Sequence, residues 1–570
     1  MKLTINKTKY NEYLYISKSI RNGKKVVTKN FLKLGTMKDL LPLHDNSRDA
    51  VIAWAKSQVD HYTQQDKENT LNIAITFSSS NRISYSNQTL SSGYLFLQDI
   101  IYKLNLDSIC DTIAKKYDFS FDLPSILSTL IVSRILSPSS KLSTYEYAKT
   151  FIEQPTFSLH DMYRALDILS QNTDYILSQL YKNSIQIIPR NTSVLYYDCS
   201  NFYFEIEEPD GLKQYGKSKE HRPNPIIQMG LFMDGNGIPL SFVIYPGNAN
   251  EQPSLIPLEK KIIKDFNISK FIVCTDAGLA STTNRKFNAL QQRSFIVTQS
   301  LKNLKGYLKD WALDPTGWSL TGDDTKYNLL TIDEELMMHK IFYKERWICE
   351  NGMEQRFIVS YSPKYKIYQQ KIRQRQIDRA NKLVTNHTRI TSRNPHSPSR
   401  FISQIKTTPT GEVAKETHYS IDNDAILKEA RYDGFYGICT TLEDTIEMIL
   451  KVNKQRWEIE ESFRIMKTDF KSRPVYLQKD NRIEAHFLTC FLSLLVYRIL
   501  ETRLDSNYTS TEIISTLRKM KVQHYKGYGY IPVYKRTEIT DSLHTTFGFQ
   551  TDTEIISEKN MKKIIKQTKR

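Results

Sequence analysis

The sequence predicts a mixed α/β fold in which a mixed sheet flanked by helices follows a helical N-terminal domain. Three observations predict it. Residues 90–185 carry apolar residues at helical spacing, residues 190–299 alternate between strand and helix patterns, and two long helical patterns follow a polar stretch that ends near residue 440. Alternation of strands with helices along a chain is typical of a sheet with helices packed on it.

The length and composition predict a multidomain protein with an anionic partner. The 570 residues suffice for three or four domains at about 150 residues each. Lys and Arg exceed Asp and Glu by 79 − 62 = 17, which favours nucleic acid before a membrane. The first residues, MKLTINKTKYNEYLY, lack an apolar run of signal-peptide length, so we expect a cytoplasmic protein. Six cysteines without a CxxC pair predict neither a zinc site nor a disulfide framework.

The N-terminal part of the chain divides into two predicted segments. Residues 1–75 predict a small β-rich module, because the alternating runs YLYISKSI and KVVTKNFLKLG flank the turn RNGK as in a β-hairpin. Residues 76–187 predict a helical domain, with helical spacing in LQDIIYKLNLDSICDTI, PSILSTLIVSRIL and MYRALDILSQNTDYILSQLY.

From residue 190 the predicted order is β-β-β-α-β-α-β. The first strand is predicted over SVLYYDCSNFYFEIE, and a hairpin about DGNG is predicted over QMGLFMD and GIPLSFVIYPG. Two more strands are predicted over KFIVCTDAG and SFIVTQS, and helices are predicted over residues 252–264 and 283–292. We expect residues 188–302 to form the first part of a core.

The rest of the chain predicts an insertion, the second part of the core and a basic end. Residues 303–440 are polar and predict an insertion, residues 441–505 the second part of the core, and residues 506–570 a basic C-terminal region. Two long helices are expected over Leu442–Phe470 and Asp480–Leu504. The apolar stretch within the second is too short to cross a bilayer and predicts a buried helix.

Two aspartates and a helix supply the candidate chemistry. Asp198 follows the apolar run SVLYY and Asp276 ends FIVCTD, although a strand-terminal aspartate alone often serves only to accept local N–H bonds. On a regular helix through RWEIEESFRIMK, Arg456, Glu460 and Lys467 fall within about 40° of one another. A salt-bridged surface helix would also place Arg456 and Glu460 four residues apart.

Three carboxylates brought together would repel one another unless cations joined them. Mg²⁺ and Mn²⁺ prefer carboxylate oxygens, and two such ions can activate a water and stabilise the leaving 3′ oxygen of a phosphodiester. Asp198, Asp276 and Glu460 are therefore candidate ligands for divalent cations that would support phosphoryl transfer. Glu461 lies about 100° around the helix, away from the cationic stripe, which favours Glu460.

Cations near these carboxylates predict contacts to phosphates. Arg456 and Lys467 share the face of Glu460, where they would hold phosphates beside the metal. The loop KQYGKSKEHRPNP adds Lys217, Lys219 and Arg222, either as phosphate contacts or as a solvated basic loop. Basic clusters at 1–36, 371–406 and 559–570 predict further contacts along a DNA duplex.

The order of strand aspartate, strand aspartate, insertion and helix glutamate resembles the DDE transposases of bacterial insertion sequences. More narrowly, Arg456-x3-Glu460-x6-Lys467 resembles the group with a ribonuclease-H-like core and a Tyr-x2-Arg-x3-Glu-x6-Lys signature. The resemblance covers about residues 190–505 and includes YYDCSNFYFE, SKEHRPNPIIQMGL and TDAGLAS. Asn453 stands where the signature has its tyrosine, which leaves one expected DNA contact open.

The resemblance implies a DNA transposase that uses two Mg²⁺ or Mn²⁺ ions in a cut-and-paste reaction. It implies cleavage at the inverted-repeat ends of the element, transfer of the 3′ ends to target double-stranded DNA, and a homodimer on DNA at the bacterial nucleoid. It assigns the metal ions to Asp198, Asp276 and Glu460, the phosphates of the transposon end to Arg456 and Lys467, and end binding to the helical domain.

Two questions about the chemistry stay open at this point. Relatives sometimes form a hairpin whose flipped base stacks on an aromatic ring, a role open to Trp311, Trp318 or Trp347, although core packing is the commoner role for each. Two other functions also fit the pattern. One is a metal-dependent ribonuclease-H-like DNA nuclease without strand transfer, and the other is a non-catalytic DNA-binding protein descended from a transposase.

Overall fold

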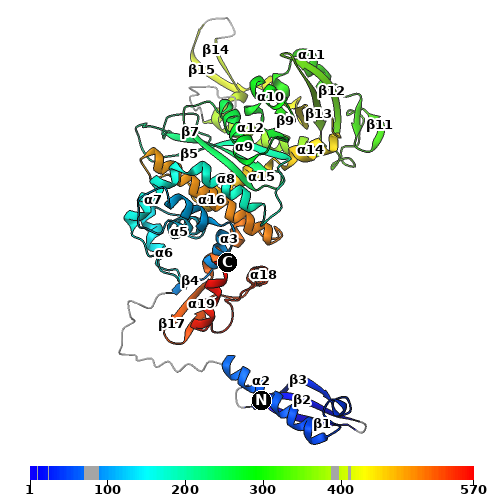
Figure 1. The fold of residues 1–570 in the computed structure, drawn as a ribbon. Helices are drawn as coiled ribbons and strands as arrows, with labels where there is room; N and C mark the ends of the chain where they lie inside the picture. The colour runs from blue at the N-terminus through cyan, green and yellow to red at the C-terminus, as the bar shows by residue number, and fades with distance from the viewer. Residues whose placement is uncertain (9–10, 23–24, 70–88, 387–396, 408–412) are drawn as a thin grey trace. The chain divides into compact units, whose positions relative to one another are not determined.

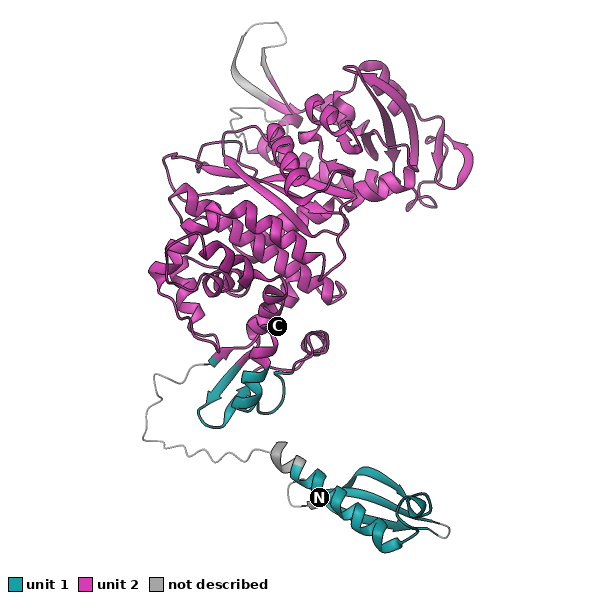
Figure 2. Cartoon of the chain, in the orientation of Figure 1, with its two compact units in different colours: residues 1–89, 522–533, 550–563 teal, residues 90–521, 534–549, 564–570 magenta. Residues whose placement is uncertain are grey.

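The computed structural model describes residues 1–8, 11–22, 25–69, 89–386, 397–407 and 413–570. The chain forms two compact units, which Figure 2 distinguishes by colour. Unit 1 contains residues 1–89, 522–533 and 550–563. Unit 2 contains residues 90–521, 534–549 and 564–570.

Unit 1 contains the predicted N-terminal hairpin. β2 (Glu12–Asn22) pairs antiparallel with β3 (Lys25–Thr36), and β1 (Lys2–Lys7) pairs with the other edge of β2. Helices α1 (Met37–Leu40) and α2 (Arg48–Asn69), which were not predicted, follow the sheet. A small apolar core joins Leu14 of β2 to Val51 and Ala55 of α2. Unit 1 also contains the hairpin of β17 (Lys521–Tyr525) and β18 (Gly529–Pro532).

The helical domain of unit 2 agrees with the prediction for residues 90–185. Its helices are α3 (Tyr94–Lys103), α4 (Leu106–Ala114), α5 (Leu123–Leu136), α6 (Lys141–Ala148), α7 (Leu159–Gln171) and α8 (Thr173–Ser184). Figure 1 shows α16 (Asp480–Arg503) lying among them. It packs on α5 and α7, and Ser493 donates to the carbonyl of Ile131.

α16 is the predicted buried helix, but the prediction that its apolar stretch is too short to cross a bilayer was wrong. Its length and hydropathy would allow it to cross a bilayer, but 94% of its most apolar window is buried inside the protein, so it is a core helix.

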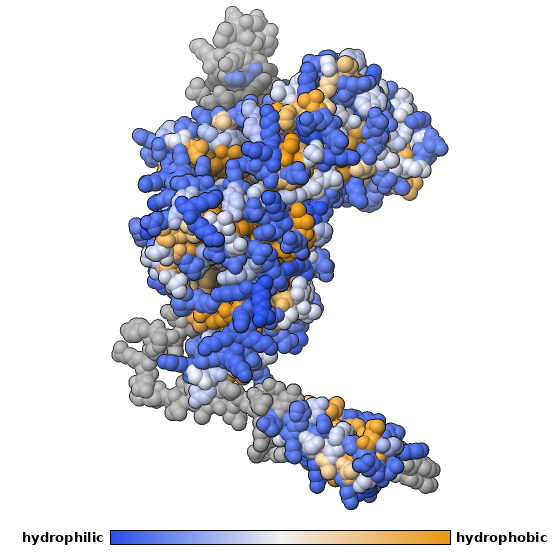
Figure 3. Space-filling model, viewed as in Figure 1, coloured by the Kyte–Doolittle hydropathy of each residue, from blue (hydrophilic) through white to orange (hydrophobic). Residues whose placement is uncertain are grey.

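Hydrophilic residues cover most of the face seen in Figure 3, where apolar residues form small separate groups.

The centre of unit 2 is a ten-stranded mixed sheet. Its order is β11-β10-β12-β13-β16-β9-β8-β5-β6-β7, with β5–β8 and β8–β9 parallel and the other pairs antiparallel. In chain order the strands are β5 (Val194–Tyr203), β6 (Ile226–Asp234), β7 (Pro239–Pro246), β8 (Phe271–Thr275), β9 (Arg293–Gln299), β10 (Trp318–Leu320), β11 (Asp323–Tyr327), β12 (Phe342–Glu350), β13 (Met353–Tyr361) and β16 (Phe435–Thr440).

The predicted order β-β-β-α-β-α-β is confirmed over β5 to β9, with α9 (Leu255–Phe266) and α10 (Thr282–Asn288) as the two helices. The residues predicted as an insertion continue the same sheet, because β13 pairs with β16 and β16 with β9. The mixed α/β class therefore holds, and the segment boundaries themselves stay predictions. The basic stretch 371–406 lies partly outside the described residues, and its first part belongs to α12 (Pro363–Thr385).

The helix expected over Leu442–Phe470 is instead divided. Thr445 caps α14 (Ile446–Gln455) by accepting from the N–H of Met448, so the helix begins four residues later than predicted. Arg456 separates it from α15 (Trp457–Arg464), and the π-helical turn η6 (Ile465–Asp469) follows. The prediction of one continuous α-helix was therefore wrong.

The remaining elements complete the described part of the chain. They are β4 (Thr89–Ser91), α11 (Gly306–Leu313), β14 (Ile402–Thr407), β15 (Val413–Ile421), α13 (Asn423–Ala430), α17 (Ser510–Lys519), α18 (Glu538–Phe547) and α19 (Glu558–Gln567).

Candidate active site

Strands β5 and β8 bring the two candidate aspartates side by side. The parallel register pairs Val194 with Ile272 and Tyr196 with Cys274, an offset of 272 − 194 = 78 residues. The same offset, continued by two residues, places Asp198 opposite Asp276. Neighbouring strands lie about 4.8 Å apart, and residues opposite each other point to the same face of a sheet. The two carboxylates therefore share one face of the sheet, with Asp198 within β5 and Asp276 directly after β8.

Each aspartate also has the local backbone bond expected of a structural role. Asp198 Oδ1 accepts from the N–H of Cys199 at 2.8 Å, and Asp276 Oδ1 accepts from the N–H of Leu279 at 3.1 Å. In the part of the chain that the structure describes, Oδ2 of each carboxylate makes no hydrogen bond to protein. One oxygen on each side chain thus remains for another ligand.

The site raises the pKa of Asp198 to about 6. Burial is the main cause, Lys219 opposes it, and the negative charge of Asp276 adds to it, while the N–H of Cys199 and the charge of Arg456 lower the pKa. A carboxylate with a raised pKa beside a second carboxylate is the electrostatic situation that a bound cation relieves.

The segment from α14 to η6 covers this face of the sheet. Tyr196, two residues before Asp198, donates to the carbonyl of Val452 at 3.0 Å and faces Gln455 at 3.3 Å. Arg456 follows, close enough for its charge to act on Asp198 and Cys274. The helical segment that carries Arg456, Glu460 and Lys467 is thereby fixed over the strand face on which Asp198 and Asp276 lie.

Glu460 lies on α15 with a side chain that is 57% exposed. Its Oε1 is 3.1 Å from Nη2 of Arg456, the i, i+4 ion pair that a salt-bridged helix also predicts. Among the described residues, the structure contains no group of three or more His, Cys, Asp or Glu side chains arranged to hold a metal ion. Two of the three predicted carboxylates are thus brought together, and the third is held by Arg456.

Lys467 lies on the η6 turn and reaches the same strand face. Its Nζ donates to Ser200 Oγ and lies 5.3 Å from the ring centroid of Phe202. Burial, and then repulsion by Lys219, lower the pKa of Lys467 to about 8, against the attraction of Asp198. Ser200 lies two residues after Asp198 on the same strand, so both side chains point to the same face of the sheet. This spacing could have identified Ser200 as a site residue from the sequence.

The basic loop after β5 is held against that strand. Asn201 donates through Nδ2 to the carbonyl of Lys217 at 3.1 Å and accepts from the N–H of Lys219 at 3.3 Å. Nζ of Lys219 donates to the carbonyl of Cys199 and lies 3.6 Å from Glu251. Lys219 therefore lies close enough for its charge to act on Asp198, although the side chains of Lys217 and Lys219 are both exposed.

Arg222 lies further along the loop and stacks on an aromatic ring. Its guanidinium is 4.1 Å from the ring centroid of Tyr203 and 3.7 Å from Glu220. Arg222 thus belongs to the rim, near the end of β5, rather than to the carboxylate pair.

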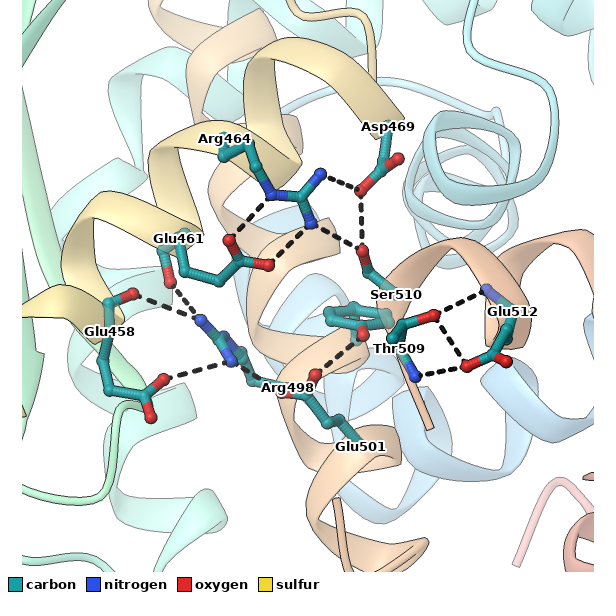
Figure 4. A network of polar contacts seen from close by, with 11 residues as sticks. Glu458, Glu461, Arg464, Asp469, Arg498, Glu501, Thr509, Ser510 and Glu512 are labelled. Carbon is teal, nitrogen blue, oxygen red and sulfur yellow. Dashed lines mark hydrogen bonds and ion pairs between the residues drawn. The ribbon is translucent and has the colours of Figure 1, made fainter. Parts of the chain in front are cut away.

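Figure 4 shows why Glu461 is not available to the site. Its carboxylate pairs with Arg464 through two hydrogen bonds of 2.7 and 2.6 Å, and Arg464 also contacts Asp469 and Ser510. The next polar group in the figure is Arg498, which bonds to Glu458 and Glu501. Glu461 is thus engaged in a network away from Asp198.

Tyr436 is a site residue that the sequence analysis missed. Its hydroxyl accepts from Nδ2 of Asn453 at 3.4 Å and pairs with Thr298 at 2.6 Å. Tyr436 also interacts electrostatically with Arg456. A tyrosine hydroxyl from β16 therefore lies beside the position where the signature tyrosine is absent, a pairing that only the tertiary fold creates.

The three tryptophans of the predicted insertion differ in exposure. Trp318 is fully buried and donates to the carbonyl of Asp314 at 2.8 Å, and Trp311 packs against Phe357. Trp347 on β12 is 46% exposed and lines a hollow of about 760 Å³ together with Arg356. Of the three, Trp347 has the accessible ring that stacking would need.

Comparison with known proteins gives one family and two solved structures. The family described as the transposase DDE domain matches residues 203–496, more than half of the chain, beginning just after Asp198. None of the curated proteins matches. A cryo-EM structure of a piggyBac transposase synaptic complex with hairpin DNA aligns with 8% identity over 84% of this chain and 87% of that chain, with a TM-score of 0.34.

The second structure is a Mos1 transposase paired-end complex with its left transposon end. It aligns with 12% identity over 41% of this chain and 64% of that chain, with a TM-score of 0.13. At these TM-scores neither likeness establishes a shared fold.

Proposed function

The chain belongs to the transposase DDE domain family, and from that premise we propose that it is the DNA transposase of a bacterial insertion sequence. It cleaves double-stranded DNA at the inverted-repeat ends of its element and transfers the 3′ ends to target DNA. The central part of its mixed sheet, from β5 to β9, is then the ribonuclease-H-like core of the enzyme.

One observation carries this proposal. Asp198 and Asp276 lie opposite each other on adjacent parallel strands, beneath the helical segment that carries Arg456, Glu460 and Lys467. A structural role for the aspartates needs only the local bond that each makes. It does not require cations from two separate segments, the basic loop and the helical segment, around the pair.

The donor set fits a hard divalent cation. Asp198 and Asp276 each keep one carboxylate oxygen that bonds to no described residue, and carboxylate oxygens are the ligands that Mg²⁺ and Mn²⁺ prefer. Glu460 would complete the set on leaving Arg456. Two bound ions would supply a nucleophilic water and stabilise the leaving 3′ oxygen.

The cationic side chains of the site would have different roles in binding DNA. Release of Glu460 would free Arg456 to bind a DNA phosphate through its planar guanidinium. Lys467 and Lys219, at the other end of the β5 face, would hold a second phosphate, which also relieves their mutual repulsion. The hydroxyl of Tyr436 beside Asn453 supplies a donor where the family signature has its own tyrosine.

The rest of the molecule contributes the DNA surface. The net charge of +17 favours binding to the polyanionic duplex, and α12 exposes a row of lysines and arginines that would contact phosphates. The helical domain of α3 to α8 would bind the transposon ends. A homodimer would bring two ends together in the bacterial cytoplasm, on the nucleoid.

The test is cleavage of labelled DNA that carries the flanking inverted repeats, with Mg²⁺ or with a chelator. Asp198→Asn, Asp276→Asn and Glu460→Gln should each reduce cleavage by about 10³-fold or more, because each removes a ligand on which charge stabilisation depends. Glu461→Gln is the matched control, since it removes the same charge one residue away and should cleave like the wild type.

The products separate the rival functions. Joined target DNA identifies a transposase, nicked DNA without joining identifies a nuclease, and end binding that survives chelation without any cleavage identifies a non-catalytic DNA-binding protein. Cleavage that persists in all three carboxylate variants would refute the assignment of the site.

A further inference from the structure

A second cationic site lies away from the carboxylates, where α5, α6 and α7 meet the chain after η6. It is a hollow of about 280 Å³. Its basic and aromatic wall is made by Arg134, Lys141, Tyr163, Lys471, Arg473, Tyr476 and His486. No aspartate or glutamate from the described ranges lines it, so the ionisable side chains of its wall other than tyrosines are all basic.

Lys141 is the first unusual feature of this hollow. Its residue is 4% exposed, and the described part of the structure gives its ammonium neither a carboxylate nor a hydrogen-bond partner. Burial, and then the charge of Arg134, lower the pKa of Lys141 to about 7. Lysine is almost never fully buried unless it is paired, because an isolated buried charge is strongly unfavourable.

Arg134 is a second buried cation without a counterion. Its Nη1 donates to the carbonyl of Phe470 at 3.3 Å and its Nη2 to the carbonyl of Ser139 at 3.2 Å, while Nε is buried with no acceptor. Carbonyl groups satisfy N–H donors but do not neutralise a guanidinium. The charge of Arg134, and that of Lys141 when it is protonated, thus meet no carboxylate among the residues that line the hollow.

The other basic groups of the hollow play lesser parts. Burial and the charges of Arg134 and Lys141 hold the pKa of His486 well below its usual value, so this ring is neutral, with Nε2 at 3.2 Å from the carbonyl of Ser472. Arg473 pairs with Glu220 and is not free. Lys471 and Tyr476 are exposed and open the hollow to solvent.

We propose that this hollow binds a phosphate group. A tetrahedral anion would accept from the Lys141 ammonium and lie beside the charge of the Arg134 guanidinium, and it would neutralise the charge that the protein leaves uncompensated. The volume admits a phosphate with bound water. Apolar side chains would fill the same positions with better stability, so the buried cations indicate a ligand rather than a structural role.

The position of the hollow along the chain indicates which kind of phosphate it binds. Arg134 bonds to the carbonyls of Phe470 and Lys471, three and four residues after Lys467, so the hollow adjoins the segment that reaches the carboxylate site. The ligand is then a backbone phosphate of the DNA strand bound there, an assignment that rests on the proposed function. Free inorganic phosphate shares the chemistry and is the second source.

The first experiment tests the hollow with inorganic phosphate alone. Phosphate should raise the thermal unfolding midpoint of the full-length wild type with saturation, because a ligand that binds the folded chain stabilises it. Lys141→Met should lose this shift, whereas Lys149→Met, which removes an exposed lysine at the other end of α6, should keep it. An equal shift in Lys141→Met and wild type would overturn the proposal.

A measurement on the wild type does not depend on the folding of any variant. A lysine with a pKa near 7 is largely an unprotonated amine at slightly alkaline pH and reacts with acetic anhydride. Bound phosphate should slow acetylation of Lys141 but not of Lys149, as followed by mass spectrometry. Equal protection of both lysines, or of neither, would also overturn the proposal.

The second experiment distinguishes the two phosphate sources by the salt dependence of DNA binding. If the phosphate belongs to DNA, Lys141→Met should reduce the slope of log K against log salt by about 0.7 to 0.9, the value for one phosphate contact. An unchanged slope, with the phosphate shift still dependent on Lys141, supports a site for free phosphate and refutes the DNA source. The experiments with inorganic phosphate do not depend on DNA cleavage. The proposed phosphate site would therefore remain supported even if the chain showed no transposase activity.

Discussion

Replacing Asp198 by asparagine should stabilise the metal-free chain and abolish its cleavage of DNA. The pKa of Asp198 is about 6 in the fold against an ordinary 3.8. At about 1.36 kcal/mol per pKa unit, the ionised carboxylate destabilises the fold by about 3 kcal/mol near neutral pH. Asparagine removes the charge and keeps an oxygen that can accept from the N–H of Cys199.

The sign of the pH dependence follows from the direction of the shift. Below pH 3.8 the carboxyl is protonated in the folded and in the unfolded chain, so it contributes no penalty. The penalty grows as the pH rises from 3.8 and is complete above about 6. Wild type and Asp198→Asn should therefore differ by about 3 kcal/mol at about pH 7 and by less than about 1 kcal/mol at about pH 4.

Urea unfolding in a chelator, followed by circular dichroism at the two pH values, measures this difference. Adding Mg²⁺ at neutral pH should then raise the stability of the wild type and leave Asp198→Asn unchanged, because only the wild type has the charge that the ion neutralises. A variant no more stable than the wild type at neutral pH, or one that responds equally to Mg²⁺, would refute the reasoning.

Three further predictions concern packing, a buried ion pair and DNA affinity. Trp318→Ala should destabilise unit 2 by about 3 to 5 kcal/mol in urea unfolding, whereas Trp347→Ala on the exposed face should change stability by less than about 0.5 kcal/mol. Arg498→Met should cost about 3 kcal/mol, because it leaves Glu458 and Glu501 without their cation, although Glu501 keeps the hydroxyl of Tyr497. Adding Glu501→Gln should restore part of that loss, and additive effects would exclude the coupling. Lys219→Met should weaken DNA binding and lower its salt slope by about 0.9, and an unchanged slope in a fluorescence anisotropy titration would place Lys219 outside the DNA contact.

The part of the site that lies on strands could be predicted from the sequence because strand patterns are local. The buried runs before Asp198 and Asp276 identified two strands, and the parallel pairing of these strands places the two carboxylates opposite each other. The state of Glu460 could not be read in the same way. An exposed glutamate four residues after an arginine fits an ion pair along a helix as well as it fits a metal site. The structure contains the ion pair between Arg456 and Glu460.

Other features depended on contacts between distant residues. The helix through Arg456 was predicted as continuous because its apolar spacing is regular, and neither the Thr445 cap nor the π-helical turn at Lys467 alters that spacing enough to be seen. The strands β10 to β13 were assigned to an insertion because their polar faces hide their pairing with the main sheet. Helix α2 was missed because its apolar stripe is narrow.

The position of α16 has a consequence for how the protein is made. The helices α5 and α7 leave the ribosome more than three hundred residues before α16, around which they pack. Until that late segment has been synthesised, the early helices lack the apolar surface that buries them, so the first half of a nascent chain cannot settle into its final fold. The helical domain would therefore complete its core only as translation nears its end.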